Sequence, residues 1–69
     1  MPSRIQSIIF SKKLLTVPTA KLWLRHYNYK SNKIDITNNY IRFRQFEPNN
    51  NNMHRTINIT DGVTAIIEF

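Results

Sequence analysis

The segment over residues 33–44 constrains the fold of this chain more than any other feature. Two short β-prone runs, KIDIT at 33–37 and YIRFR at 40–44, flank the dipeptide Asn38-Asn39. Asparagine at both central positions of a two-residue connection favours a type I′ turn, which needs positive φ twice. Such a loop sets the opposed pairs as Thr37–Tyr40, Ile36–Ile41, Asp35–Arg42, Ile34–Phe43 and Lys33–Arg44. Since a slip by one residue would mix the apolar and polar faces, the sequence predicts an antiparallel hairpin in this register.

A helical pattern precedes the hairpin. Thr16 suits an N-cap, and Pro18 falls in the first turn, where its missing N–H costs nothing. Apolar residues then recur with helical spacing on one face, at Ala20, Trp23, Leu24 and Tyr27. Asn28 suits the C′ position, because asparagine tolerates the left-handed conformation found there. The sequence therefore predicts an amphipathic helix over 17–27.

Three further segments have the β-branched and aromatic character of strands, at 4–10, 54–60 and 63–69. Asp61-Gly62, between the last two, is a strong signal for a two-residue turn. The run EPNNNN at 47–52 indicates a loop, since proline is excluded from central strands and asparagine favours turns. Its composition makes it the segment expected to be most mobile.

The predicted elements follow the order β-α-β-β-β-β. We expect one α+β domain over residues 1–69, with one antiparallel or mixed sheet and a single helix packed on one face. The last three strands are expected to form an antiparallel meander, with the first strand in the same sheet. The expected core is Ile5 or Ile8, Ile9, Ala20, Trp23, Leu24, Tyr27, Ile34, Ile36, Ile41, Phe43, Ile57, Ile59, Val63, Ala65 and Ile67. Strand alternation places Phe69 inward and Glu68 outward, on a face that a single helix leaves open.

Charge is distributed unevenly along the chain. Residues 1–34 hold seven of the ten Lys and Arg and no acid, whereas residues 35–69 hold three cations and four acids, which gives the net charge of +6. A positive half attracts polyanions or acidic protein surfaces at long range. The absence of cysteine excludes disulfides and thiolate zinc sites, and the apolar runs are too short to span a bilayer.

The residues that support catalysis are scarce. Two His and four widely spaced acids do not form a metal-ligand pattern, and a single glycine cannot build a phosphate-cradling loop. No nucleophile stands in a recognisable pattern with a base. We therefore expect no enzyme activity, no catalytic residue, no metal, no cofactor, no small-molecule substrate and no membrane insertion.

The second strand of the hairpin carries the clearest binding signal. Tyr40, Arg42 and Arg44 share one face, and open sheets hold single strands by aromatic stacking combined with phosphate contacts. In the predicted register Asp35 neutralises Arg42, which leaves Arg44 beside Lys33 as the unbalanced cations. The candidate nucleic-acid-binding residues are Arg44, Lys33, Lys12, Lys13, Arg42, Tyr40 and Arg55. The competing interpretation is that these are solvated side chains of an ordinary strand.

The expected function is therefore non-specific nucleic-acid binding through charge. The alternative is a protein–protein interaction or assembly module, as a homodimer or on a larger partner. A small domain with an uncovered sheet face and free edge strands can pair with another chain. Ile8 and Ile66, if they face outward, would be apolar contact points on that surface.

The order of motifs resembles a known small domain. The chain contains an opening Ile5-Gln6-Ser7 strand, a helix with Ala20, Trp23, Leu24 and His26 of an AxxWLxxH pattern, a turn with Asp35 and Thr37, an Arg42-Phe43-Arg44 strand and a closing Gly62-Val63 strand that ends in the aromatic Phe69. This set resembles an uncharacterised domain found in proteins of tailed bacteriophages and nucleo-cytoplasmic large DNA viruses. Two positions depart from that pattern: a basic segment is reduced to Met53-His54-Arg55, and Glu68 stands where a glycine is expected.

No established activity accompanies this family, so the resemblance implies the fold and a viral source but no mechanism. For the protein–protein alternative, it implies a virion component or a host-factor binder. The expected location is the host cytoplasm or nucleus, or the virion, and secretion is not expected. The acid-free, Ser- and Arg-containing N-terminal segment leaves a mitochondrial presequence as an alternative.

Overall fold

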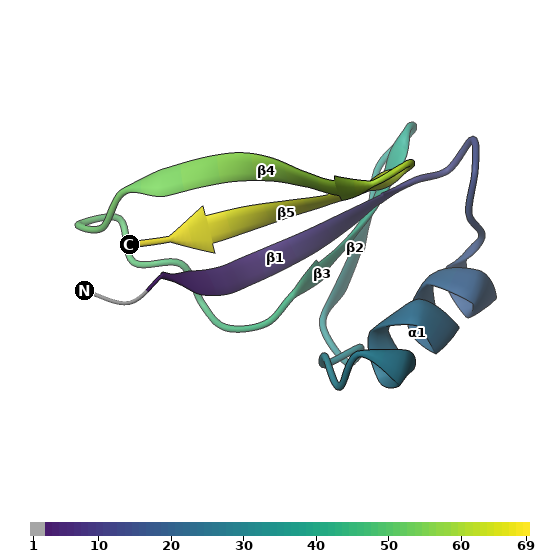
Figure 1. The fold of residues 1–69 in the computed structure, drawn as a ribbon, viewed down its shortest axis with the longest axis horizontal. Coiled ribbons are helices and arrows are strands. Elements are labelled where there is room, and N and C mark those ends of the chain that lie inside the picture. The colour runs from purple at the N-terminus through teal and green to yellow at the C-terminus, as the bar shows by residue number, and fades with distance from the viewer. Residues whose placement is uncertain (1–2) are drawn as a thin grey trace.

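The computed structural model describes residues 3–69, in which one helix and five strands form an α+β fold (Figure 1). The elements are β1 (Arg4–Ser11), α1 (Val17–His26), β2 (Ile34–Ile36), β3 (Tyr40–Arg44), β4 (His54–Thr60) and β5 (Val63–Glu68). This confirms the predicted β-α-β-β-β-β order. Within residues 3–69, no helix has the length and apolarity needed to cross a membrane.

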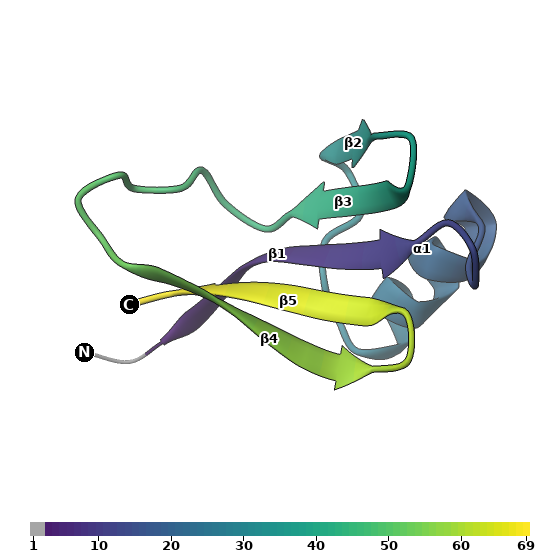
Figure 2. The ribbon, with the colours of Figure 1, turned by 90° about the horizontal axis from the view of Figure 1, so that it is seen from above.

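The five strands form one antiparallel sheet in the order β2-β3-β1-β5-β4 (Figure 2). The expected meander of the last three strands is wrong, because β1 lies between β3 and β5. As the sheet's central strand, β1 buries Ile8 and Phe10 completely. From β3 to β4 the chain must cross about 14 Å, three strand spacings, which the segment 45–53 spans easily at about 3.3 Å per residue.

The hairpin has the predicted register, with Ile34 opposite Phe43 and Ile36 opposite Ile41. Its turn is not type I′, since Asn28 is the only non-glycine residue of the described chain with positive φ. Instead the Thr37 hydroxyl accepts a hydrogen bond from the Tyr40 backbone N–H at 3.1 Å. Apolar pairing therefore determines the register here, and the turn adapts to it.

Both ends of α1 are capped as the sequence predicts. The Thr16 hydroxyl accepts from the Thr19 N–H at 3.4 Å, and Asn28 adopts a φ of 63° just beyond the helix. The Asn28 N–H donates to the Arg25 carbonyl and the Tyr29 N–H to the Leu24 carbonyl, which together make a Schellman motif. Tyr27 is the C-cap residue and is 54% exposed, so its expected place in the core is wrong.

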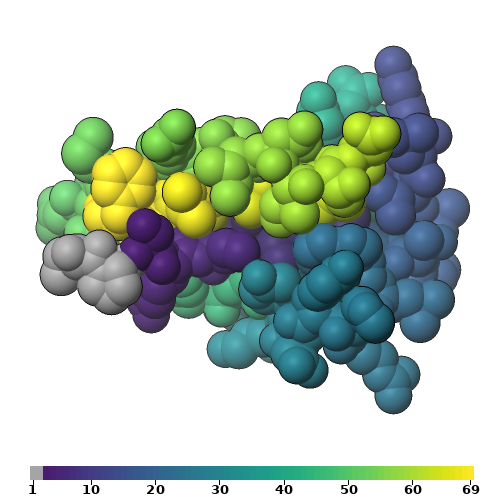
Figure 3. All heavy atoms as spheres, viewed as in Figure 1, coloured from purple at the N-terminus to yellow at the C-terminus, as the bar shows by residue number. Residues whose placement is uncertain are grey.

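The core lies between α1 and one face of the sheet. Its buried apolar residues are Ile8, Phe10, Ala20, Leu24, Ile41, Phe43, Val63 and Ala65. Trp23 is half-buried, with its ring edge-on to Phe10 at a centroid distance of 5.5 Å. Figure 3 shows the helix and the segment after it as a mass beneath one end of the strands only.

Several predictions about which side chains are buried are wrong. Ile36 and Ile59 are 57% and 40% exposed because they lie on the edge strands β2 and β4, beyond the cover of the helix. In β1 the phase is reversed: Ile8 faces the helix, while Ile9 is half-buried on the open face. Glu68, expected outward in solvent, is only 4% exposed. Phe69, expected inward, is 42% exposed.

Candidate nucleic-acid interface

The open face of the sheet contains a shallow concavity of about 360 Å³. Strands β1, β3, β4 and β5 contribute to its lining, and so does the turn after β2. The lining residues are Ile9, Thr37, Tyr40, Arg42, Thr56 and Thr64. Ile9 lies at the centre, because it pairs with Arg42 on one side and Thr64 on the other. The lining contains one cation, one aromatic residue, Tyr40, which is 52% exposed, and no acid.

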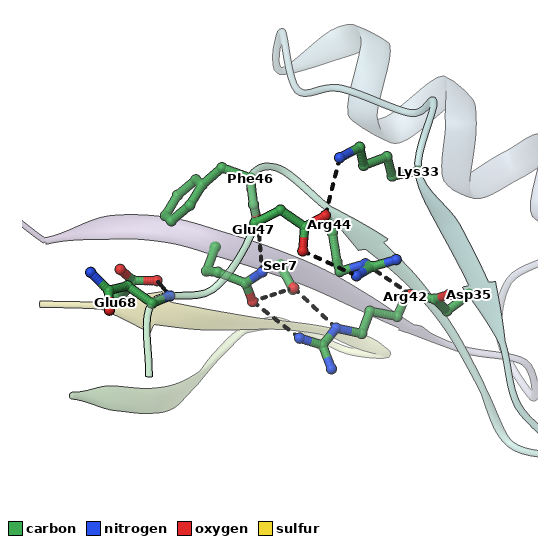
Figure 4. Close-up of polar contacts among 10 residues, drawn as sticks. Ser7, Lys33, Asp35, Arg42, Arg44, Phe46, Glu47 and Glu68 are labelled. Carbon is green, nitrogen blue, oxygen red and sulfur yellow. Dashed lines mark hydrogen bonds and ion pairs between the residues drawn. The ribbon is translucent and has the colours of Figure 1, made fainter. Parts of the chain in front are cut away.

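Arg42 is held in this concavity by neutral groups (Figure 4). Its Nε donates to the Ser7 hydroxyl at 3.0 Å and its Nη2 to the Gln6 side-chain carbonyl at 3.1 Å. The expected ion pair with Asp35 is not formed, and no carboxylate of residues 3–69 lies within 4.0 Å of Arg42. The position of the Arg42 guanidinium is therefore fixed by hydrogen bonds, and no carboxylate of the described residues compensates its positive charge.

The two groups that hold Arg42 are completely buried in the sheet. The β1–β5 register shifts between Ile5 and Ser7, which makes Gln6 an extra residue in β1. The Gln6 side chain donates to the Phe46 carbonyl at 2.7 Å, and Ser7 donates to the Gln6 side-chain oxygen. The candidate list contained neither residue. The signal was two successive polar residues between the apolar residues Ile5 and Ile8, a break in alternation that indicates a bulge.

Arg44 and Lys33 form the neutralised part of the hairpin. Arg44 Nε lies 3.1 Å from Asp35 Oδ2, and its Nη1 lies 3.6 Å from Glu47 Oε2. Lys33 Nζ donates to Glu47 Oε1 at 3.1 Å, as Figure 4 shows. The Lys33 hydrogen bond and the charges of Lys33 and Arg44 lower the pKa of Glu47. The charges of Arg44 and Lys33 are thus compensated by Asp35 and Glu47. The expectation that Arg44 and Lys33 are unbalanced cations is wrong.

Lys13 and Tyr40 are brought together at the turn end of the sheet. With Ser11 and Asn39 they line a second hollow of about 320 Å³, which shares Tyr40 with the first. Lys12 Nζ donates to the Thr37 carbonyl at 3.1 Å, which places a further cation at the same turn.

Arg55 does not join this group. It is opposite Ile67, two positions along the strand from Ile57, which pairs with the core residue Ala65. Alternation therefore puts Arg55 on the helix side of the sheet, away from Thr56 and the open face. Of the seven candidates, the structure gathers Tyr40, Arg42, Lys12 and Lys13 around the two hollows and the turn beside them. Arg44 and Lys33 line neither hollow and are ion-paired, and Arg55 lies on the helix side of the sheet.

The loop before β4 is tied to Glu68. Asn52 Nδ2 donates to Glu68 Oε1 at 2.7 Å, the Asn49 N–H donates to Oε2 at 3.2 Å, and His54 Nε2 lies 3.3 Å from Oε2. The Asn52 hydrogen bond contributes most to lowering the pKa of Glu68, against the opposing effect of burial. These contacts explain why an acid is buried where alternation predicts an exposed one. The expected mobility of this loop stays a prediction.

Residues 3–69 contain no group of three or more His, Asp or Glu side chains that could hold a metal ion. Comparison with models of protein families, with curated proteins and with solved structures finds no match to this chain. The resemblance to the phage and large-virus domain therefore stays a prediction.

Proposed function

We propose that this chain is a non-catalytic basic module that binds nucleic acid non-specifically through charge. The observation that supports the proposal is the distribution of its ion pairs. Of the ten Lys and Arg, only Lys33 and Arg44 lie within 4.0 Å of a carboxylate among residues 3–69, so eight cations keep no acidic partner. A polyanion is the partner that such a surface attracts most strongly.

The acids are placed so that they weaken this attraction little. Asp35 and Glu47 are engaged by Arg44 and Lys33, and Glu68 is buried against His54 and the loop. Asp61 alone among the four acids has no ion pair in the part of the chain that the structure describes. The net charge of +6 is thus carried by cations that have no carboxylate partner within residues 3–69.

The test is a fluorescence-anisotropy titration with labelled single-stranded DNA, duplex DNA and RNA. We expect the logarithm of the association constant to fall linearly with the logarithm of salt concentration between about 20 and 200 mM. Lys13→Gln should weaken binding more than Lys33→Gln, a charge-matched control whose charge is already compensated by Glu47. Absence of binding to all three probes at low salt would end the proposal.

Protein–protein interaction is the second candidate, and a different surface favours it. A groove of about 550 Å³ between α1 and the following segment is lined by Pro18, Lys21, Leu22, Arg25, Tyr29 and Ser31. Leu22 is 66% exposed there, between two cations and with no acid in the helix. Such a groove fits an acidic segment with an apolar side chain.

Selection from a random peptide library should enrich acidic peptides that contain an apolar side chain, and the enriched peptides should not bind the Leu22→Ser variant. Enrichment that Leu22→Ser leaves unchanged would contradict this candidate.

A further inference from the structure

We infer that the open-face concavity is a subsite for one unpaired nucleotide of a single strand, with the base against Tyr40 and a phosphate at Arg42. The inference rests on the proposed function and adds what charge alone does not provide, a preference for single strands over duplexes. It is carried by two residues that line the same hollow: Arg42, whose guanidinium has no carboxylate partner in the described chain, and Tyr40, which is exposed.

Arg42 has the properties of an anion-binding group. Its two hydrogen bonds go to Gln6 and Ser7, both 0% exposed and both neutral, so the protein fixes the guanidinium without cancelling its charge. An arginine carries five N–H donors in a planar fork, and two atoms of the fork are used here. The remaining donors suit the bidentate geometry of a phosphate. Arg44, by contrast, already has two carboxylates.

Tyr40 is the residue available for stacking. Tyr40 is 52% exposed and lines both hollows, so a base can reach it from the side of Arg42 or from the side of Lys13. Phe46, the other aromatic residue of this segment, is occupied, because the Arg4 guanidinium lies 4.2 Å from its ring centroid. The stacking contribution therefore depends on one ring.

The remaining lining supports a sequence-tolerant single-strand site. Ile9 provides an apolar floor, and the hydroxyls of Thr56 and Thr64 provide hydrogen-bonding groups that can both donate and accept, whereas the Thr37 hydroxyl is engaged by the Tyr40 backbone. A volume of about 360 Å³ lies at the low end for ligand pockets, which limits occupancy to about one nucleotide at a time. A base inside a duplex is covered on both faces by its neighbours and cannot stack on Tyr40. Only an unpaired base gains this contact.

The experiment compares the binding of an oligothymidylate of about 12 nucleotides with that of a duplex of equal length, at one fixed salt concentration. Tyr40→Leu leaves the net charge unchanged, and we expect it to weaken single-strand binding about tenfold and duplex binding less than about twofold. Tyr40→Phe keeps the ring and should restore single-strand affinity.

Arg42→Gln and Lys21→Gln remove the same charge from opposite sides of the molecule. We expect Arg42→Gln to weaken single-strand binding about tenfold, and Lys21→Gln, on the helix groove, less than about threefold. Arg42→Lys keeps the charge but loses the fork, and it should fall between Arg42→Gln and the parent chain. Circular dichroism of each variant verifies the fold.

Two failures are distinguishable. Equal affinity for the single strand and the duplex, together with no effect of Tyr40→Leu, would overturn this inference and leave charge-driven binding standing. Absence of binding to either probe would overturn the proposed function and this inference together.

Discussion

Asp35 pairs with Arg44, its diagonal neighbour, and not with Arg42, the residue directly opposite it on β3. The distance from Arg44 Nε to Asp35 Oδ2 is 3.1 Å. Twist between adjacent strands brings diagonal positions within reach of long side chains. Because Asp35 and Glu47 both contact Arg44, Arg42 is the arginine of the hairpin without a carboxylate partner among the described residues, which shifts the candidate interface from the hairpin edge to the centre of the open face.

Asp35→Asn should therefore strengthen nucleic-acid binding at low salt, by a few-fold, because it releases part of the charge of Arg44. The free energy of unfolding should fall by less than about 1 kcal/mol, since the pair is partly exposed and such pairs contribute little. Anisotropy titration and urea unfolding measure the two effects. Weaker binding by a folded Asp35→Asn variant would show that the carboxylate itself positions a binding residue.

The loop anchor predicts a pH dependence of stability. The pKa of Glu68 is lowered in the folded state, chiefly by the Asn52 hydrogen bond, so its ionised form stabilises the fold above the unfolded pKa of about 4.5. That contribution is lost as the pH falls through the lower, folded-state pKa. Glu68→Gln should be less stable than the parent at pH 7, because the amide NH₂ cannot accept from the Asn49 N–H.

Urea unfolding between about pH 3 and pH 7 tests this, and the difference between the parent chain and Glu68→Gln should shrink as the pH decreases. Asp61→Asn is the matched control, since it removes a carboxylate away from the loop. A constant difference across the whole range would contradict the role assigned to the ionised carboxylate.

The helix terminus offers a substitution that stabilises. Asn28 has a φ of 63°, a conformation that glycine adopts without strain and alanine does not. We expect Asn28→Gly to raise the free energy of unfolding by a few tenths of a kcal/mol and Asn28→Ala to lower it by about 1 kcal/mol. Thermal unfolding of the two variants should bracket the parent chain. The reverse order would mean that the Asn28 side chain makes a contact that outweighs its backbone strain.

Two leucines on α1 give a matched pair for the core. Leu24 is 0% exposed and Leu22 is 66% exposed. Leu24→Ala should cost about 2–5 kcal/mol, comparable with the whole stability of a domain of this size, and leave the chain largely unfolded. Leu22→Ala should change stability by less than about 0.5 kcal/mol. Circular dichroism and denaturant unfolding measure both effects. A larger loss of stability for Leu22→Ala than for Leu24→Ala would mean that the helix packs in another orientation.

Local patterns were sufficient for the elements and for the hairpin. The Thr16 cap and the Asn28 terminus are decided by groups within a few residues of each other, so the sequence predicts both ends of α1. The register of β2 and β3 depends on matching apolar pairs across two residues of connection. The turn type could not be predicted in the same way. The turn is stabilised by a hydrogen bond from the Tyr40 N–H to the Thr37 hydroxyl, and neither asparagine adopts the positive φ of a type I′ turn.

The partners of polar side chains required the tertiary structure. Whether Arg42 or Arg44 takes Asp35 depends on sheet twist, and Glu47 meets Lys33 only because the chain bends after β3. Glu68 receives its three partners from a loop whose path follows from the position of β1 in the sheet.

The sequence by itself thus determined the class of fold, the order of the elements, the helix ends and the hairpin register, since each depends on spacing along a short stretch of chain. Only the tertiary structure decided the strand order and the residues of the open face. Those depend on β1, whose neighbours β3 and β5 come from distant parts of the chain, and on the extra residue Gln6 that places a buried polar pair beneath Arg42.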